Sequence, residues 1–227
     1  ATLNSGAAAN ILSYSSSSPA VASVDNKGVI TSKTRGTAVI TCKAYNGVSA
    51  SCTITSRIVD YTKAYTTDEV IRDAGLIAKQ YPDAVTVSSA GKSTLGQDLT
   101  LVKLGHGSKK ALITGGIHSR EHLTVTFTML CLEEYAAAYC SKTGAYGGYN
   151  MKQLLDSYTL YIVPLMNPDG MDVVTKFTNP LYKYTGSRME FKSNANGVNL
   201  NRNFPFYWGS ITDGGISTRY TDVQRYK

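Results

Sequence analysis

From Tyr61 onward, helical patterns alternate with short apolar runs, and this alternation restricts the possible folds more than any other feature of the sequence. Residues 66–83, TTDEVIRDAGLIAKQYPD, begin with a capping box and place their apolar side chains on one helical face. A strand pair, VTVSSAG and LTLVKLG, follows. The runs KALITGGIH and YTLYIVPLMNPDG then indicate buried strands, separated by a long apolar helix at 123–140 and a short one at 151–157. Helices alternating with buried strands predict an α/β domain built on a mixed sheet.

Residues 1–58 have a different pattern and predict a separate, small all-β module. Short runs alternate apolar with small polar residues, and the turn sequences Asn26-Lys27-Gly28 and Asn46-Gly47 separate them. Such runs, joined by Asn and Gly turns, indicate an antiparallel β sandwich. Residues 15–44 resemble the bacterial immunoglobulin-like group 2 domains of surface proteins, which implies a partial module of that kind with a spacer or wall-adhesion role. Cys42 and Cys52 flank the second turn, so the sequence permits a cross-strand disulfide.

The composition argues against several classes of function. Hydrophobic residues make up 42% of the 227 residues and charged residues 17%, which suits a chain with a buried core. The net charge is +7, but the lysines and arginines are scattered, and no basic stripe or nucleic-acid-binding motif accompanies them. We therefore expect no nucleic-acid partner. Because no run reaches the roughly 18 apolar residues that a membrane span needs, we also expect no membrane span.

The stretch TGGIHSREHLTV, residues 114–125, holds two of the chain's three histidines beside a glutamate. Three interpretations remain open from these residues alone. The first is a polar strand end followed by a helix-capping glutamate. The second is an HxxEH motif, in which His118 and His122 bind zinc, Glu121 is the base and Glu190 is the third ligand. In the third, His118 and Glu121 are the zinc ligands and His122 is a bystander, because donors three residues apart can reach one cation.

Four motifs from Tyr61 to the end of the chain decide between these interpretations through a resemblance. They are, in order, YPDAVTVSSAGKSTLGQDLTLVKLG, GGIHSREH, LMNPDGMD and GVNLNRNFPFYW. Together they resemble the zinc carboxypeptidases of the carboxypeptidase A family, so residues 61–227 are predicted to be the N-terminal portion of such a domain. The resemblance implies a Zn²⁺ cofactor, with His118 and Glu121 as two of its three ligands. Residues 167–170, NPDG, are predicted to form a structural type I turn.

The resemblance also implies which residues contact the substrate. Asn201 and Arg202, in NLNRNF, are expected to hold the substrate's terminal carboxylate, because a guanidinium can bind a carboxylate through two hydrogen bonds and an amide adds a directed donor. Arg120 is expected to make a secondary contact with a carboxylate or carbonyl. Lys192 stands where the family often carries an arginine that polarises the scissile carbonyl. Two interpretations of Lys192 stay open. Its positive charge could stabilise the oxyanion, although lysine lacks the two-pronged guanidinium of arginine, or it could be a solvated surface lysine.

The family's remaining catalytic groups are expected beyond these residues. Its second histidine ligand, a tyrosine and the catalytic glutamate follow NLNRNF in the family, and no histidine occurs after His122. The predicted parent protein is a zinc metallocarboxypeptidase, extracellular or on a bacterial cell surface. It would hydrolyse the C-terminal bond of peptides with a free carboxylate, including peptidoglycan stem peptides. The 227 residues alone are expected to bind zinc weakly and to be inactive. The alternative is a non-catalytic protein that binds peptide termini or the cell wall on a peptidase-like scaffold.

Overall fold

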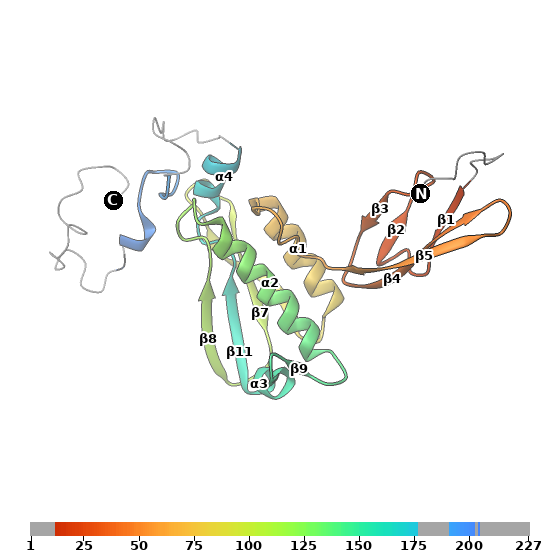
Figure 1. The fold of residues 1–227 in the computed structure, drawn as a ribbon. Helices are drawn as coiled ribbons and strands as arrows, with labels where there is room; N and C mark the ends of the chain where they lie inside the picture. Colours follow the sequence, from red (N-terminus) through yellow and green to blue (C-terminus); the bar gives the residue numbers. More distant parts are fainter. Residues whose placement is uncertain (1–11, 177–190, 203, 205–227) are drawn as a thin grey trace. The chain divides into compact units, whose positions relative to one another are not determined.

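A computed structural model describes residues 12–176, 191–202 and 204, and the chain divides into two compact units, residues 1–60 and 61–227. The first unit contains two small antiparallel sheets (Figure 1). One has the order β1-β4-β5 and the other pairs β2 with β3. Both predicted Asn/Gly turns are present, with Gly28 and Gly47 at φ angles of 82° and 87°. The strands are β1 (Leu12–Ser16), β2 (Ala22–Val24), β3 (Ile30–Ser32), β4 (Gly36–Ala44) and β5 (Ser49–Ser56).

The four cysteines are free. In the β4–β5 register, Cys42 lies opposite Ala50 and Cys52 lies opposite Ile40. The two cysteines of this hairpin are therefore diagonal neighbours, whose Cα atoms are about 7–8 Å apart by the usual sheet spacing, longer than the Cα separation of most disulfides.

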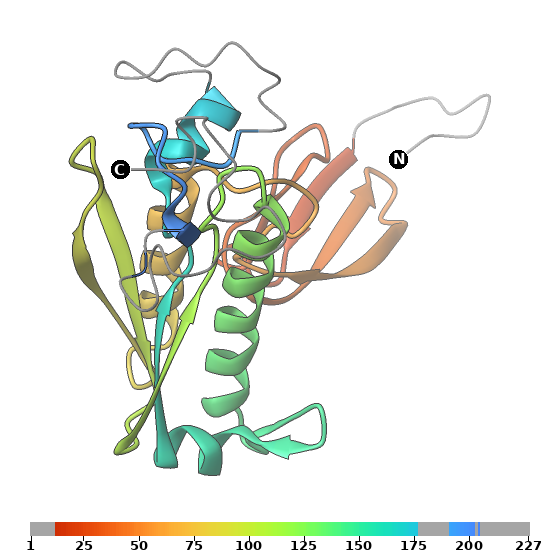
Figure 2. The same cartoon turned by 90° about the vertical axis from the view of Figure 1, so that its left-hand side faces the viewer.

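The second unit is built on a mixed four-stranded sheet with the order β6-β7-β11-β8. Strand β11 pairs antiparallel with β7 and parallel with β8, and β6 pairs antiparallel with β7. Helices α1 (Thr67–Gln80) and α2 (His122–Tyr139) lie side by side on one face of this sheet (Figures 1 and 2). The predicted α/β class with a mixed sheet is confirmed. The strands are β6 (Val85–Lys92), β7 (Asp98–Leu104), β8 (Lys109–Thr114) and β11 (Tyr158–Val163).

Both long helices follow from their sequence patterns. In α1 the capping box is complete, because Thr66 Oγ1 accepts the Glu69 N–H at 3.3 Å and Glu69 Oε2 accepts the Thr66 N–H at 3.0 Å. On its apolar face Val70, Ala74 and Ile77 are buried, whereas Ile71 is 47% exposed. Helix α2 is apolar on most of its surface, and the side chains that recur along one face of it are completely buried: Val125, Met129, Leu132 and Ala136. Among the described residues, no helix combines the length and hydropathy that a membrane crossing requires.

Strand β8 was predicted to be buried, and this prediction is wrong for the described part of the chain. The side chain of Leu112 is 69% exposed and that of Ile113 is 40% exposed. The reason is the strand order, since β8 stands at the end of the sheet and pairs only with β11 among the described strands. A short apolar run does not reveal from sequence alone whether its strand is central or at an edge.

The NPDG sequence also differs from its prediction, because it begins helix α4 (Pro168–Lys176) instead of forming an isolated turn. Asn167 precedes the helix, and its Oδ1 accepts the Gly170 N–H at 3.0 Å. Proline at the first helical position has the required φ angle and needs no hydrogen-bond partner there. The remaining short elements are β9 (Ala145–Tyr146), β10 (Tyr149–Asn150), α3 (Met151–Ser157) and the 3₁₀ turn η2 (Leu200–Arg202).

The buried carboxylate of Asp169 attaches helix α4 to the turn between β6 and β7. Its oxygens accept hydrogen bonds from Ser93 Oγ at 2.7 Å, the Leu95 N–H at 3.0 Å and Gln97 Nε2 at 2.9 Å. Asp169 is only 1% exposed, so each of these donors replaces a water that the carboxylate has lost. The network holds α4 against the end of the sheet.

Candidate functional site

The residues that could bind a metal ion or a substrate follow the carboxyl ends of the parallel strands β8 and β11 (Figure 2). Strand β8 ends at Thr114 and leads into the segment 115–121, and β11 ends at Val163 and leads into α4. Ligands bind at this end of the strands in open α/β sheets, because the loops there meet the N-termini of the following helices.

A pair of glycines lets the chain turn sharply from β8 into α2. Gly116 has a φ of 58°, and a Cβ there would lie 2.7 Å from side-chain atoms of Leu165 and Val125. Glycine adopts this backbone conformation easily. Because it has no Cβ, the side chains of Leu165 and Val125 can occupy the space beside it. The Gly116 N–H donates to Thr124 Oγ1 at 2.9 Å, which ties the turn to the first turn of α2. His118 and Glu121 are thereby held in the short link between strand and helix.

Within this link, His118 Nδ1 lies 2.8 Å from Glu121 Oε1. Glu121 occupies the N-cap position of α2, but its side chain makes no capping hydrogen bond. The capping interpretation therefore does not account for this carboxylate. The His118 side chain is 15% exposed and that of Glu121 is 41% exposed, so solvent reaches both. A ring nitrogen and a carboxylate oxygen at this distance need a proton or a cation between them, and both atom types are zinc ligands.

Three side-chain contacts bring residues 191–199 against the link. Ser119 Oγ donates to the Phe191 carbonyl at 2.7 Å. Asn167 Nδ2 lies 2.9 Å from the Ser193 carbonyl oxygen and 3.4 Å from that of Ile117, so this one amide bridges the two segments. Ser119 is completely buried and Asn167 is 2% exposed. The sequence pattern predicted Asn167 only as part of a turn and did not single out Ser119. Neither contact could be predicted, because the partners of both residues lie far away in the sequence.

The segment also places Asn199 beside the histidine. Asn199 Oδ1 lies 3.1 Å from His118 Nε2, across 81 positions of sequence, and Asn199 is 3% exposed. Its place two residues before Asn201, inside GVNLNRNF, is the only sequence signal that marked it. His118 therefore has a polar partner at each ring nitrogen.

The other predicted site residues are placed as follows. Arg120 is exposed next to the pair, Lys192 is partly exposed, and Asn201 is exposed in η2. The backbone of Arg202 also belongs to η2, whereas its side chain and all of Glu190 lie outside the described residues. The described part of the chain contains no cluster of three or more His, Cys, Asp and Glu side chains that could hold a metal ion.

His122 is the first residue of α2, so the two histidines of HSREH do not share a helix. Its Nδ1 is buried and has no hydrogen-bond partner among the residues that the structure describes. Burial lowers the pKa of His122, which favours the neutral ring. These observations give no support to the HxxEH interpretation, which requires both histidines on one helical face.

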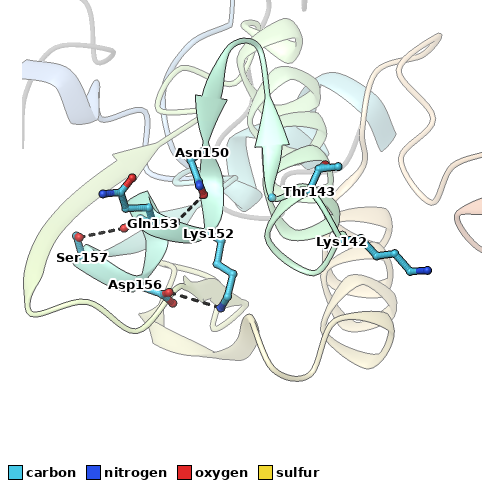
Figure 3. Close-up of a pocket in the computed structure, with 8 residues that line it drawn as sticks. Lys142, Thr143, Asn150, Lys152, Gln153, Asp156 and Ser157 are labelled. Carbon is cyan, nitrogen blue, oxygen red and sulfur yellow. Dashed lines mark hydrogen bonds and ion pairs between the residues drawn. The ribbon is translucent and has the colours of Figure 1, made fainter.

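A polar pocket lies near the other end of α2, roughly 27 Å away along an 18-residue helix. Figure 3 shows that Lys152 points to Asp156, and Asn150 Oδ1 accepts the backbone N–H of Gln153 at 3.0 Å. The pocket contains no histidine and lies far from the His118–Glu121 pair, so we do not assign the chemistry to it. Its lining residues are Lys142, Thr143, Gly144, Asn150, Lys152, Gln153, Asp156 and Ser157.

Comparison with protein families matches both units of the chain. Residues 71–226 match the zinc carboxypeptidase family. Residues 2–45 match the immunoglobulin-like domain of intimin, a short match at the N-terminus.

Individual proteins give the same result for the second unit. A zinc carboxypeptidase of Saccharothrix mutabilis subsp. capreolus is 28% identical over 155 residues, which cover 66% of this chain and 34% of that protein. A γ-D-glutamyl-L-diamino acid endopeptidase of Lysinibacillus sphaericus is 29% identical over 165 residues, 68% of this chain and 41% of that protein. The chain therefore spans well under half the length of these two relatives. The crystal structure of carboxypeptidase A from Helicoverpa armigera has the same fold, with a TM-score of 0.51 and 24% identity over 73% of this chain and 38% of that one.

Proposed function

Since the chain belongs to the zinc carboxypeptidase family, we propose that it supplies two zinc ligands and the substrate-carboxylate site of a peptidase that removes C-terminal residues. Zn²⁺ is the metal of this family, which agrees with the cofactor expected from the sequence. The proposed ligands are His118 and Glu121. The observation that carries the proposal is the 2.8 Å approach of His118 Nδ1 to Glu121 Oε1 at the carboxyl end of the sheet.

The remaining residues receive roles that suit their chemistry. Asn201 and Arg202 hold the terminal carboxylate of the peptide through amide and guanidinium donors. Arg120, exposed beside the ligand pair, contacts a second carboxylate or carbonyl of the substrate. Lys192 places positive charge near the oxyanion. Zinc, when bound, lowers the pKa of a coordinated water and polarises the scissile carbonyl.

The substrate class we propose is peptides with a free C-terminal carboxylate, including the stem peptides of peptidoglycan. One relative is named for cleaving γ-D-glutamyl-L-diamino acid bonds, and the N-terminal unit matches an intimin immunoglobulin-like domain. The net charge of +7 suits an anionic surface such as a cell wall. An extracellular or cell-surface location follows from this proposal.

For the 227 residues themselves we propose weak zinc binding and no peptidase activity. The three histidines of the sequence are His106, His118 and His122, and only His118 lies with a carboxylate at the site. His106 Nε2 instead contacts the Asp83 carbonyl. A catalytic zinc site needs three protein ligands and a base for its water, so the described residues offer an incomplete set.

Calorimetric titration of the chain with Zn²⁺ tests the assignment. His118→Ala and Glu121→Ala should each weaken binding at least tenfold, because each removes one of two ligands. His106→Ala is the matched control and should leave binding unchanged. His122→Ala should also leave it unchanged, and a large loss there would restore the HxxEH interpretation. Wild-type affinity in His118→Ala would refute the assignment, and submicromolar binding by the wild-type chain would refute the incomplete site.

A further inference from the structure

The hairpin that follows helix α2 carries two tyrosines on its surface. Gly147 and Gly148 join its strands β9 and β10, and their φ angles of 56° and 84° fit a two-residue type I′ turn. The turn sets Tyr146 directly opposite Tyr149, and residues that are opposite in an antiparallel pair share one face of the hairpin. Tyr149 is 69% exposed and Tyr146 is 40% exposed. This tyrosine pair therefore presents aromatic rings to solvent.

One ring of the tyrosine pair is fixed by packing. The ring of Tyr146 meets that of Tyr135, on α2, edge to face, with centroids 5.5 Å apart and an interplanar angle of 76°. Aromatic pairs in this geometry attract each other beyond the effect of the area that they bury. An exposed ring that is fixed in advance loses little conformational freedom when a ligand binds. The tyrosine pair is thus suited to contact a ligand that has an apolar face.

The polar pocket of Figure 3 begins at the base of the same hairpin, where Asn150 directly follows Tyr149. Its volume of about 370 Å³ falls within the range of small-ligand sites. Among the described residues, the hydrogen bonds of Gln153 use its backbone: its N–H donates to Asn150 Oδ1 at 3.0 Å, and its carbonyl accepts Ser157 Oγ at 2.9 Å. The side-chain amide of Gln153, which lines the pocket, can therefore donate to a ligand and accept from it.

The charged groups of the pocket favour a neutral ligand, because they pair with each other. Lys152 Nζ lies 3.5 Å from Asp156 Oδ2, and the Tyr139 hydroxyl donates to Asp156 Oδ1 at 2.7 Å. The hydrogen bond from Tyr139 holds the pKa of Asp156 below its ordinary value, so this carboxylate stays ionised at neutral pH and can accept further hydrogen bonds. Lys142, the other lysine of the lining, extends away from these groups in Figure 3.

We propose that the tyrosine pair and this pocket form a binding site for a neutral oligosaccharide of pyranose rings. A pyranose ring has a face of C–H groups, which packs on an aromatic ring, and an edge of hydroxyl groups, which donate and accept hydrogen bonds. The tyrosine pair suits the face, and Gln153 and Asp156 suit the edge. The site lies roughly 27 Å from the His118–Glu121 pair, at the other end of α2, so the proposal does not depend on zinc.

NMR titration of the nitrogen-15-labelled chain tests the site, with tetramers of β-1,4-linked N-acetylglucosamine and of β-1,4-linked glucose as probes. Backbone amide signals of residues 142–157 should shift with at least one tetramer. Tyr149→Ala and Gln153→Ala change exposed side chains, and each should weaken binding about fivefold, because one removes a stacking ring and the other a hydrogen-bonding amide. Tyr45→Ala is the matched control and should bind like wild type, since Tyr45 is 64% exposed at the distant β4–β5 turn.

The absence of shifts with both tetramers at up to about 10 mM, or wild-type affinity in either variant, would overturn the proposal. A response to a sugar-free peptide alone would overturn it in favour of a peptide subsite. Free oligosaccharides and the glycan strands of a cell wall share this chemistry, and co-sedimentation with peptidoglycan stripped of its stem peptides separates them. Retention of wild type but not of Tyr149→Ala would identify the wall polymer, whereas binding of the tetramers alone would identify a free sugar.

Discussion

Gly170, in the first turn of α4, should be essential for attaching residues 191–199 to the site. A Cβ at this position would lie 2.3 Å from the Ser193 carbonyl oxygen and 2.5 Å from Asn167 Nδ2. Ordinary contacts are about 3.4 Å or longer, so Gly170→Ala forces the Ser193 carbonyl away by roughly 1 Å. The 2.9 Å bond from Asn167 Nδ2 to that carbonyl would then be lost.

The expected loss of stability follows from two opposing effects. Overpacking of this kind costs about 1–3 kcal/mol, and loss of a buried hydrogen bond costs about 1 kcal/mol more. Replacing glycine by alanine within a helix returns about 0.5–1 kcal/mol. We therefore expect Gly170→Ala to destabilise the second unit by about 2 kcal/mol. With an m-value of about 2 kcal/mol per M, the urea midpoint should fall by about 1 M.

Far-UV circular dichroism at helix wavelengths is the appropriate assay, because the described helices all belong to the second unit. Gly75→Ala is the matched control, since Gly75 lies within α1 and a Cβ there meets nothing within 4 Å. It should raise the midpoint by a few tenths of a molar. A Gly170→Ala midpoint equal to or above that of wild type would show that residues 191–199 do not pack on α4 as described.

Three further predictions concern side-chain contacts at the starts of helices α1 and α4. Asp169→Ala removes the acceptor of three hydrogen bonds and should cost about 3 kcal/mol in urea unfolding; a loss below about 1 kcal/mol would refute the network. Thr66→Ala removes the α1 cap and should cost about 1 kcal/mol by the same assay, and no change would contradict the capping box. Burial raises the pKa of Glu69, but hydrogen bonds from Lys63 and Thr66 outweigh it and lower that pKa below its ordinary value of 4.5. The ionised Glu69 carboxylate therefore stabilises the fold fully above about pH 4.5, and this stabilisation is lost as the pH falls through the lowered pKa. Glu69→Gln should reduce the fall in unfolding free energy on the acid side. An unchanged dependence of the unfolding free energy on pH would count against this prediction.

Most of the secondary structure could be predicted because it depends on local patterns. Three elements are each encoded within about 20 neighbouring residues: the capping box at Thr66, the strand pair that follows α1, and the apolar helix that begins at His122. One prediction failed because its outcome depended on distant neighbours, since strand β8 is apolar in sequence yet lies at an end of the described sheet. The turn predicted at NPDG instead opens helix α4, for local reasons, because Asn167 caps it and proline occupies its first position.

The amino-acid sequence by itself determined that His118 and Glu121 stand between a strand and a helix, because three positions of spacing and a preceding glycine pair are local facts. Only the tertiary structure decided which distant groups support them. Asn199 lies 81 positions from His118, and Asn167 bridges segments that are 50 and 26 positions away. Such contacts arise when the sheet brings the ends of β8 and β11 together. No periodicity in the sequence records this, because hydrogen bonds between far segments depend on the three-dimensional path of the chain.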